Sequence, residues 1–412
     1  MNRIFHYLVL YSVILVSGGL IYAVHKDIII ITLLVFCFLV ILLGKVRIDR
    51  RFFYLFALVS MLLLFTSIYT NGSLSIQTVF NYLLRFLLAY VAYKWDKERA
   101  YERVIKLILC LSIFSLIGFL FTGILGVKLP GFLFFSSQEY PAYHFNIFYA
   151  YAENYHSGRN IGIFNEPGVY QTILNFALMI MFFRPPMSMI NIRSKVIVVL
   201  VVTIISTFST TGYINMAVII LFYVLTNRKK DTASKRLKII SIISSIAFIF
   251  YINFASESSS IFHTIISKIS EDGQINFGAS TGLARIESMK ADTKIALLHP
   301  FGLGYTEYSR VWKSFVEVNI IDTSSVSGIT IAMATIGIHT TLLIYGYVAI
   351  SFLNNNKNPF EFIVFVFVLI FNGLSQPGLI FPLYIMYAIS RKSTGDMRIK
   401  RPQTNKGTIE VY

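Results

Sequence analysis

Long runs of apolar residues, separated by short polar segments, extend from residue 5 to residue 389 of this chain. A helix of about 20 apolar residues crosses the hydrocarbon core of a bilayer. Two runs, 196–225 and 360–389, exceed one span and predict two short helices each. Single spans are predicted at residues 5–23, 28–43, 52–69, 78–93, 104–125, 161–183, 237–254 and 328–353. The pattern therefore predicts an all-α polytopic membrane protein with about 12 transmembrane helices.

Basic clusters flank both ends of each of the two longest runs. Since Lys and Arg collect on the cytoplasmic side of a membrane, a run with two basic flanks crosses an even number of times. The turns are expected at residues 209–212 (Ser-Thr-Thr-Gly) and at 375–378 (Ser-Gln-Pro-Gly), where proline removes a backbone donor.

Composition and charge fit this picture. Of the 412 residues, 56% are apolar and 14% are charged, and the mean hydropathy is +0.67. A formal charge of +16 raises nucleic-acid binding as an alternative, but the cations form short clusters between apolar runs. With both termini in the cytoplasm, most of them fall on the cytoplasmic side, so the charge indicates topology and no nucleic-acid partner is expected.

A single transmembrane domain, residues 1–392, is predicted, followed by a polar cytoplasmic tail at 393–412. Two external segments, about 126–160 and 255–327, are too long to be plain turns, so chemistry is expected there. The two cysteines, Cys37 and Cys110, lie in apolar runs and predict neither a disulfide nor a thiolate metal site.

Glu166 is unusual because a carboxylate inside the predicted span 161–183 is costly in lipid. Arg159 lies about two helical turns before it, and the preceding loop is rich in Phe and Tyr. Two interpretations are open. One is a structural ion pair with an aromatic interfacial belt, and the other is a polar, aromatic-lined site at the outer surface, where aromatic faces suit sugar rings.

Arg85 lies in the middle of the predicted span 78–93, where a guanidinium needs a partner, an anion or a water-filled cavity. An intramembrane ion pair is one interpretation. Contact with an anionic group of a substrate is the other, because the planar guanidinium suits phosphate.

Residues 281–300 predict a helix within the second external segment. Arg285 and Asp292 would lie near one face of it, and a solvated amphipathic helix on the membrane is the alternative to a functional one. The following Phe-Gly-Leu-Gly-Tyr at 301–305 predicts a tight turn or a close backbone approach to a ligand. Since no metal-ligand or phosphate-loop motif is present, no metal and no cofactor are expected.

Three segments carry a family pattern: GRNIGIFNEPGVYQ at 158–171, STFSTTGYINMA at 206–217 and TGLARIESMKADTKIALLHPFGLGYTEYS at 281–309. They resemble the bacterial Wzy-type oligosaccharide repeat-unit polymerases, which share a superfamily with the O-antigen ligases. The resemblance covers most of the chain and implies a GT-C-related glycosyltransferase fold whose two external loops each supply an essential arginine, here Arg159 and Arg285. The ligase branch has a histidine where this chain reads Thr-Ser-Ser-Val-Ser-Gly at 323–328, which favours a polymerase.

The resemblance implies a multi-pass protein of the bacterial inner (plasma) membrane. It would join undecaprenyl-diphosphate-linked oligosaccharides, as donor and acceptor, into O-antigen or another surface polysaccharide at the outer face. A polysaccharide co-polymerase that regulates chain length is a candidate partner. Arg159 and Arg285 would stabilise negative charge on the leaving diphosphate, and Glu166 or His299 would accept the proton of the acceptor hydroxyl.

Arg85, Asn160, Asn165 and Tyr305 are the candidates for substrate binding. Two alternatives remain to this function: a ligase-type transferase, and a transporter of lipid-linked oligosaccharides with its site at the broken helix pairs. A transporter should gather its intramembrane polar groups at those breaks, whereas Arg85 and Glu166 lie elsewhere and the breaks are uncharged.

Overall fold

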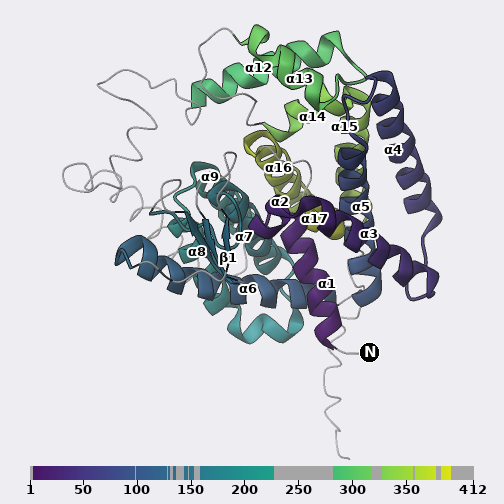
Figure 1. The fold of residues 1–412 in the computed structure, drawn as a ribbon. Coiled ribbons are helices and arrows are strands. Elements are labelled where there is room, and N and C mark those ends of the chain that lie inside the picture. Colours follow the sequence, from purple (N-terminus) through teal and green to yellow (C-terminus); the bar gives the residue numbers. More distant parts are fainter. Residues whose placement is uncertain are drawn as a thin grey trace, which may run out of the picture.

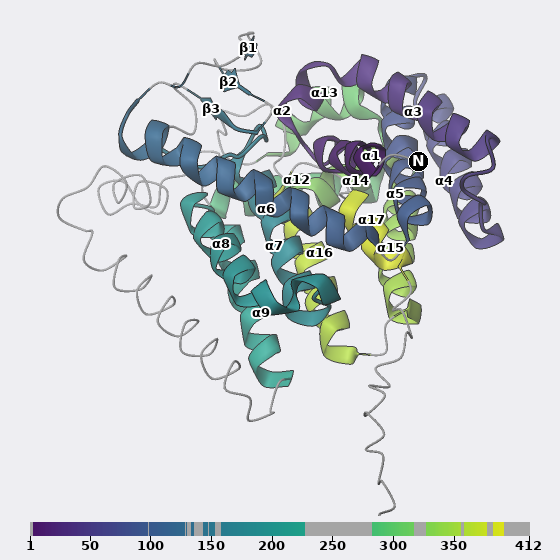
Figure 2. The same ribbon diagram turned by 90° about the horizontal axis from the view of Figure 1, so that it is seen from below.

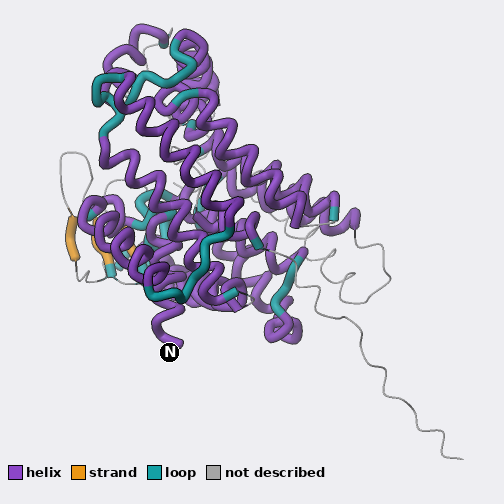
Figure 3. The backbone as a smooth tube through the Cα atoms, turned by 90° about the vertical axis from the view of Figure 1, so that its right-hand side faces the viewer, coloured by secondary structure: helices purple, strands orange, loops and turns teal. Residues whose placement is uncertain are grey.

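The computed structural model describes residues 3–97, 99–127, 129, 133–135, 143–146, 148–152, 158–226, 282–316, 327–355, 358–376 and 382–390. The predicted span 237–254 and the predicted tail 393–412 lie outside these ranges. Within them the chain is mainly helical, and Figure 3 shows the short strands together at one edge of the molecule. The predicted all-α class is confirmed apart from this small sheet.

The helices of the first half are α1 (Arg3–Val16), α2 (Leu20–Val24), α3 (Lys26–Leu42), α4 (Arg50–Tyr69), α5 (Ile76–Asp96), α6 (Arg99–Phe119) with the π-helical η1 (Leu120–Ile124), α7 (Pro167–Phe183), the 3₁₀ turn η2 (Met187–Ile192), α8 (Arg193–Ser206) and α9 (Thr210–Thr226). Those of the second half are α12 (Gly282–Leu298), α13 (Tyr305–Phe315), α14 (Gly328–Ile336), α15 (Ile338–Asn355), α16 (Pro359–Ser375) and α17 (Pro382–Ile389). Three antiparallel strands, in the order β1 (Leu133–Phe135), β2 (Tyr143–Phe145) and β3 (Ala150–Ala152), pair between α6 and α7 in sequence, with His144 opposite Phe134 and Tyr151.

Three of the described helices are long and apolar enough to cross a membrane: Arg50–Tyr69, Arg99–Ile124 and Met187–Ser206. Shorter apolar helices occupy Ile4–Val16, Pro167–Phe183, Thr210–Thr226 and Pro359–Ser375. The chain is thus a helical protein with three described helices that are long and apolar enough to span a membrane, while the count of 12 and the GT-C relationship stay predictions.

The break predicted at 209–212 is observed slightly earlier in the chain, α16 ends at Ser375 where the second break was predicted, and two unpredicted breaks appear. α8 ends at Ser206 and α9 begins at Thr210, with Phe208 in the left-handed region at φ +48°. The predicted single spans 5–23 and 328–353 are wrong, because each consists of two helices. Gly18 (φ +117°) separates α1 from α2, and Gly337 (φ +93°) separates α14 from α15. Glycine reaches these conformations at low cost, so an apolar run turns there without any polar signal.

Two hydrophobic cores organise the molecule. α7 is at the centre of the larger one, and every residue from Pro167 to Phe182 is buried. Figure 2 shows α6 crossing in front of α7 and α8, which it contacts. The smaller core joins α12, α13 and α14 through Ala291, Ile295, Tyr308, Trp312, Ile331 and Ala334. In Figure 1, α12 and α13 lie next to each other above α14, which both of them contact.

Contacts between the segments that join the helices agree with the predicted sides of the membrane. Lys94 pairs with Asp49 at 2.6 Å, and both lie in segments predicted to be cytoplasmic. The backbone N–H of Leu20 donates to the carbonyl of Ile163 at 2.9 Å, and both lie at the predicted outer face. Such pairs are compatible with the predicted topology, which itself remains a prediction.

The Gly-Leu-Gly turn after α12 packs against backbone of the same chain. A Cβ at Gly302 (φ +91°) would lie 2.5 Å from the carbonyl oxygen of Thr335, and one at Gly304 (φ +74°) would lie 2.5 Å from the backbone N of Leu74. The N–H of Ile338 donates to the carbonyl of Pro300 at 2.9 Å. The predicted tight turn is therefore confirmed, and the backbone that these glycines approach belongs to the α4–α5 turn and to the break at Gly337.

Replacing Gly302 by alanine should lower the free energy of unfolding by about 3 kcal/mol or more. The new Cβ would combine left-handed strain of about 1–2 kcal/mol with a clash against fixed backbone. Gly44→Ala is the matched control, because Gly44 also has a positive φ (+66°) but its Cβ would meet nothing within 4 Å. Unfolding of both variants in mixed detergent micelles measures the difference; equal losses would mean that backbone strain alone matters.

Candidate functional site

The guanidinium of Arg159 closes the end of α8. Its Nε donates to the carbonyl of Thr207 at 3.1 Å, and its Nη2 donates to the carbonyl of Phe208 at 2.9 Å. The last carbonyls of a helix lack partners within the helix and carry partial negative charge, so a cation there is stabilising. Arg159 thus has a structural role that its place in the sequence did not reveal.

Asn160 is fully buried and joins α6 to α8. Its Nδ2 donates to the hydroxyls of Ser206 at 2.9 Å and Ser115 at 3.2 Å, and its Oδ1 accepts from the N–H of Gly162 at 3.0 Å. Ser115 also bonds to the hydroxyl of Tyr170 at 2.7 Å. Contact of Asn160 with a substrate would require these bonds to open, so its geometry favours a structural role over the predicted binding role.

The helix predicted to begin at residue 161 begins at Pro167, and Glu166 is its N-cap residue, with extended backbone (φ −142°, ψ 145°). The prediction that this carboxylate lies within a span is therefore wrong. Proline at the first helical position needs no hydrogen-bond acceptor for its nitrogen, and it fixes the start of α7 here. Asn165 and Glu166 are both half-buried in front of the positive end of the helix dipole, where a negative charge is favourable.

Arg85 lies among phenols and beside a second cation. Its Nε donates to Oδ1 of Asn81 at 3.3 Å, and the hydroxyl of Tyr22 donates to the same oxygen. Lys26 is within electrostatic reach: burial lowers the pKa of Lys26, the positive charge of Arg85 lowers it further, and Asp27 opposes the shift. Two like charges held this close to each other form a favourable site for an anion.

Tyr305 belongs to the same neighbourhood. The phenol of Tyr82 is within electrostatic reach of both Arg85 and Tyr305, and that of Tyr345 is within reach of Tyr82 and Arg85. Tyr305 is 41% exposed, at the start of α13. The fold therefore places Tyr305, a predicted substrate-binding residue, near Tyr82, which lies one helical turn before Arg85 on α5.

α12 is confirmed as a helix over Gly282–Leu298, and it is attached by a buried carboxylate. Asp292 is fully buried; its Oδ1 accepts from Tyr308 at 2.7 Å and from Trp312 at 3.0 Å, and its Oδ2 accepts from Thr330 at 2.5 Å. One face of α12 is thus packed on α13 and α14, which excludes a wholly solvated helix. Three donors keep a buried carboxylate stable as an anion.

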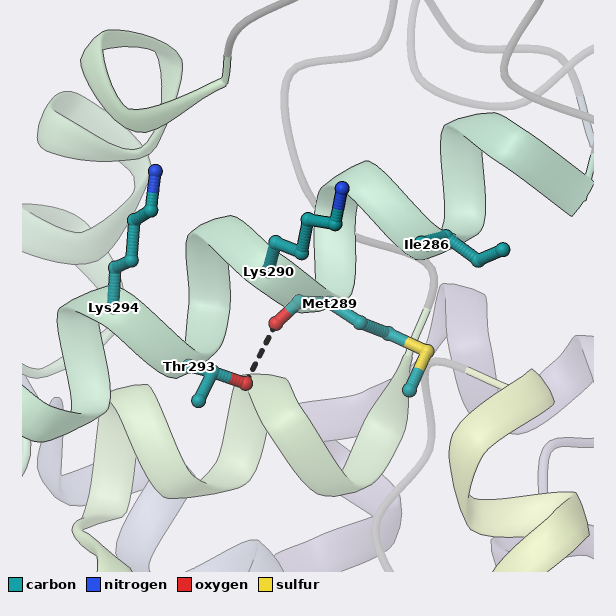
Figure 4. A pocket seen from close by; sticks show the side chains of 5 residues that line it. All are labelled: Ile286, Met289, Lys290, Thr293 and Lys294. Atoms are coloured by element: carbon teal, nitrogen blue, oxygen red, sulfur yellow. Dashed lines mark hydrogen bonds between the residues drawn. The ribbon is translucent and has the colours of Figure 1, made fainter.

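The opposite face of α12 carries a shallow groove of about 380 Å³. It is lined by Ile286, Met289, Lys290, Thr293 and Lys294, and Figure 4 shows both lysine side chains extending away from the apolar Ile286 and Met289. Lys290 pairs with Glu287 at 2.6 Å. The groove combines an apolar floor with cations, a combination that suits an amphipathic anion.

Arg285 and His299 are at opposite ends of α12. The side chain of Arg285 lies outside the described residues, and only its place in the helix is known. His299 is half-buried in the turn that ends α12; its N–H donates to the carbonyl of Ile295 at 2.9 Å, and its carbonyl accepts from the N–H of Gly302 at 2.8 Å. These backbone bonds fix His299 at the start of the glycine turn.

A chain of contacts connects two of the three segments that carry the family pattern, 158–171 and 281–309. Ile163 bonds to Leu20 in the first turn of α2, Gln77 bonds to Asp27 in the first turn of α3, and Ser73 bonds to Tyr305 at 3.0 Å. Lys26, Tyr22 and Asp292 were not predicted as site residues. Lys26 precedes a predicted span like an ordinary loop cation, and only the fold places it beside Arg85.

In the described part of the chain, no three His, Cys, Asp or Glu side chains gather as metal ligands. Comparison with protein-family models and with curated proteins finds no match for the chain. The family pattern therefore rests on the motifs within the sequence, and the geometry around Arg85 carries the functional argument further.

Proposed function

We propose that this chain is a metal-independent glycosyltransferase that polymerises undecaprenyl-diphosphate-linked oligosaccharide repeat units at the outer face of the bacterial inner membrane. The motifs at 158–171, 206–217 and 281–309 support this reading. The observation that carries it is the pair of cations formed by Lys26, at the start of α3, and Arg85, in the middle of α5, beside the phenols of Tyr22, Tyr82 and Tyr345.

A diphosphate between a lipid tail and a sugar needs three kinds of contact, and this region offers them. Arg85 presents a planar fork to phosphate oxygens, and Lys26 adds a second positive charge. The nearby phenols provide faces and hydroxyls for a sugar. Exposed apolar side chains of the neighbouring α4, such as Met61 and Leu64, would lie against the lipid.

In the proposed reaction, a hydroxyl oxygen of the acceptor sugar attacks the anomeric carbon of the donor. The bond between that carbon and the diphosphate oxygen breaks, and the electron pair leaves with the diphosphate. Fixed cations stabilise the developing charge, which Arg85 and Lys26 would do together with Arg285. The acceptor proton passes to Glu166 or His299. Glu166 was first selected because it lay inside a predicted span. Since it is the N-cap residue of α7, this reason no longer favours it over His299, and both residues remain candidate bases.

A transporter of lipid-linked oligosaccharide is a second candidate because of one observation. Where the broken pairs α8–α9 and α16–α17 meet, the structure holds a buried cluster of amide side chains, including Gln171, Asn215 and Asn372. Discontinuous helices with polar groups between them are typical of transport sites. These groups are uncharged, however, whereas the cations that suit a diphosphate lie on α3 and α5.

The size profile of surface and lipid-linked glycans tests the proposal in cells that lack this protein, with and without complementation. We expect the ladder of polymer to collapse to single exported repeat units and to return on complementation. Polymer that accumulates on the lipid carrier would instead indicate a ligase. Units trapped on the cytoplasmic side would indicate the transporter.

A further inference from the structure

An exposed apolar surface on α4 continues onto the turn after α12. α4 is long and apolar enough to cross a membrane, and its exposed side chains include Met61, Phe65 and Ile68, which recur along one face of the helix. The ring of Phe301, in the turn after α12, lies 5.6 Å from that of Phe65 and 6.0 Å from that of Tyr69. Phe301 is exposed as well. The end of α12 therefore lies beside the face of α4 that would contact lipid.

The outer face of α12 carries the same kind of surface. Ile286, Lys290, Thr293 and Leu297 are exposed and recur every three or four residues, so they form one stripe along the helix. Leu297 and Leu298, at the end of α12, are 70% and 63% exposed. A lysine beside such residues can lay its apolar stem on lipid and hold its ammonium group among the headgroups. The stripe therefore suits the interface between lipid and water.

The neighbouring helix α13 has an exposed face of a different kind. α13 packs against α12 in the smaller core. After Tyr305, its exposed residues are all polar: Thr306, Ser309, Arg310, Lys313 and Ser314. This face suits water. The exposed leucines are therefore specific to α12, and they indicate that lipid covers its outer face.

The shallow groove of about 380 Å³ brings two cations next to the apolar residues of this face. Ile286 and Met289 line it together with Lys290 and Lys294, whose side chains extend away from them (Figure 4). Thr293 also lines the groove, but its hydroxyl donates to the carbonyl of Met289 at 2.7 Å within the helix. The ammonium groups are therefore the charged groups that the groove presents to a ligand.

Lys290 can bind an anion in addition to its pair with Glu287. The two side chains are 2.6 Å apart, and that of Lys290 is exposed. An exposed pair of this kind contributes little to stability, and an ammonium group has three N–H donors. Since Lys290 and Lys294 face one carboxylate, these three groups keep one net positive charge. A phosphodiester, with its single negative charge, matches this balance.

We propose that the outer face of α12 binds an anionic phospholipid of the surrounding membrane. The phosphate would lie beside Lys290 and Lys294, and the acyl chains would cover Leu297 and the apolar side chains of the groove. The diphosphate of the proposed reaction carries more charge and has its own pair of cations, Arg85 and Lys26. This inference goes beyond the proposed polymerase activity and does not depend on it, because lipid contact is measured without a reaction.

Fluorescence quenching by brominated lipid tests the contact directly. The full-length variant Leu297→Trp is placed in phosphatidylcholine vesicles that contain a minor fraction of brominated phosphatidylglycerol or of brominated phosphatidylcholine. The signal of Trp95 and Trp312 in the unchanged protein is subtracted. We expect both lipids to quench the new tryptophan, with an association about fivefold or more in favour of phosphatidylglycerol. Ser309→Trp, on the polar face of α13, is the matched control and should not be quenched.

Charge variants connect the preference to the two lysines. In the Leu297→Trp protein, Lys290→Gln combined with Lys294→Gln should remove the preference for phosphatidylglycerol, because the phosphate loses both cations. Arg310→Gln combined with Lys313→Gln removes two exposed cations of α13 and should leave the preference unchanged.

Three results would overturn the proposal. If neither lipid quenches Leu297→Trp, water or another protein covers this face. Equal quenching by both brominated lipids would mean membrane contact without a site for an anion. A preference that survives the double lysine variant would place the anion elsewhere on the protein. If Leu297→Trp does not fold, Leu298→Trp, at the adjacent exposed position, decides by the same measurement.

Discussion

Replacing Arg85 by methionine is expected to lower glycan polymerisation at least about 100-fold, with the protein still inserted in the membrane. Losing one preformed charged donor from a transition state costs about 10²–10³ in rate. Methionine keeps the aliphatic part of the side chain but removes the guanidinium. This group donates to Asn81 and, in the proposal, also binds the diphosphate. The measurement is the length distribution of polymer made from lipid-linked repeat units by membranes that contain the variant.

Two further variants make this result specific. Arg85→Lys keeps the charge and loses the fork, so partial activity is expected if charge and geometry both matter. Arg193→Met is the matched control: Arg193 is also half-buried and donates to backbone carbonyls, those of Met181 at 2.9 Å and Phe182 at 3.0 Å, but it lies at the predicted cytoplasmic end. Full-length polymer from well-inserted Arg85→Met would exclude Arg85 from the reaction.

Replacing Arg184 by methionine is expected to lower the free energy of unfolding by about 3–5 kcal/mol. The guanidinium of Arg184 pairs with Glu361 at 2.5 Å, and the side chain of Glu361 is only 1% exposed. Arg184 also lies over the rings of Tyr387 and Phe352, at 4.9 and 5.2 Å from their centres. Removing Arg184 would leave the carboxylate of Glu361 buried without its cation. Among these partners, only the hydroxyl of Tyr387 would still donate to it, at 2.6 Å.

A double variant isolates the charge effect. In Arg184→Met with Glu361→Gln no unpaired charge is buried, so a large part of the lost stability should return. Lys106→Met is the control, because Lys106 forms an exposed pair with Glu102 that should contribute less than about 0.5 kcal/mol. Unfolding curves in mixed micelles compare the wild type, Arg184→Met, Glu361→Gln, the double variant and Lys106→Met. Additive losses in the double variant would show that Arg184 acts by packing and not through its charge.

Hydropathy predicted the helices well where a span is straight and uninterrupted. The run that became α4 was placed to within two residues at its start and ended at the same residue. The hydropathy pattern missed the turns at Gly18 and Gly337, because apolar residues continue on both sides of each turn. The turn at Gly337 depends on a carbonyl of Pro300, so its cause is a tertiary contact that no local pattern contains.

The candidate site remains a prediction, and only part of its surroundings follows from the sequence. Sequence selected Arg85 for its position within a predicted span, but Lys26 could not be connected to it before the fold placed α3 against α5. Arg159 was selected for its charge. Its hydrogen-bond acceptors, the carbonyls of Thr207 and Phe208, lie 48 and 49 residues further along the chain, so no local pattern indicates them. For the helix of Asp292 the sequence left a functional and a solvated interpretation open, and neither connected Asp292 to its donors Tyr308 and Trp312, one turn apart on α13.

The hydrogen bonds of Ser73 determine when α13 can join the rest of the fold during synthesis. The carbonyl of Ser73 accepts the N–H groups of Tyr305 and Thr306, and its hydroxyl accepts that of Glu307, 234 residues further along the chain. At a synthesis rate of about 5–20 residues per second, α13 leaves the ribosome about 10–50 s after Ser73. During this time the turn between α4 and α5 cannot form its hydrogen bonds to α13. Joining α13 to this turn is a late event in assembly, and a nascent chain that stops before residue 305 cannot complete it.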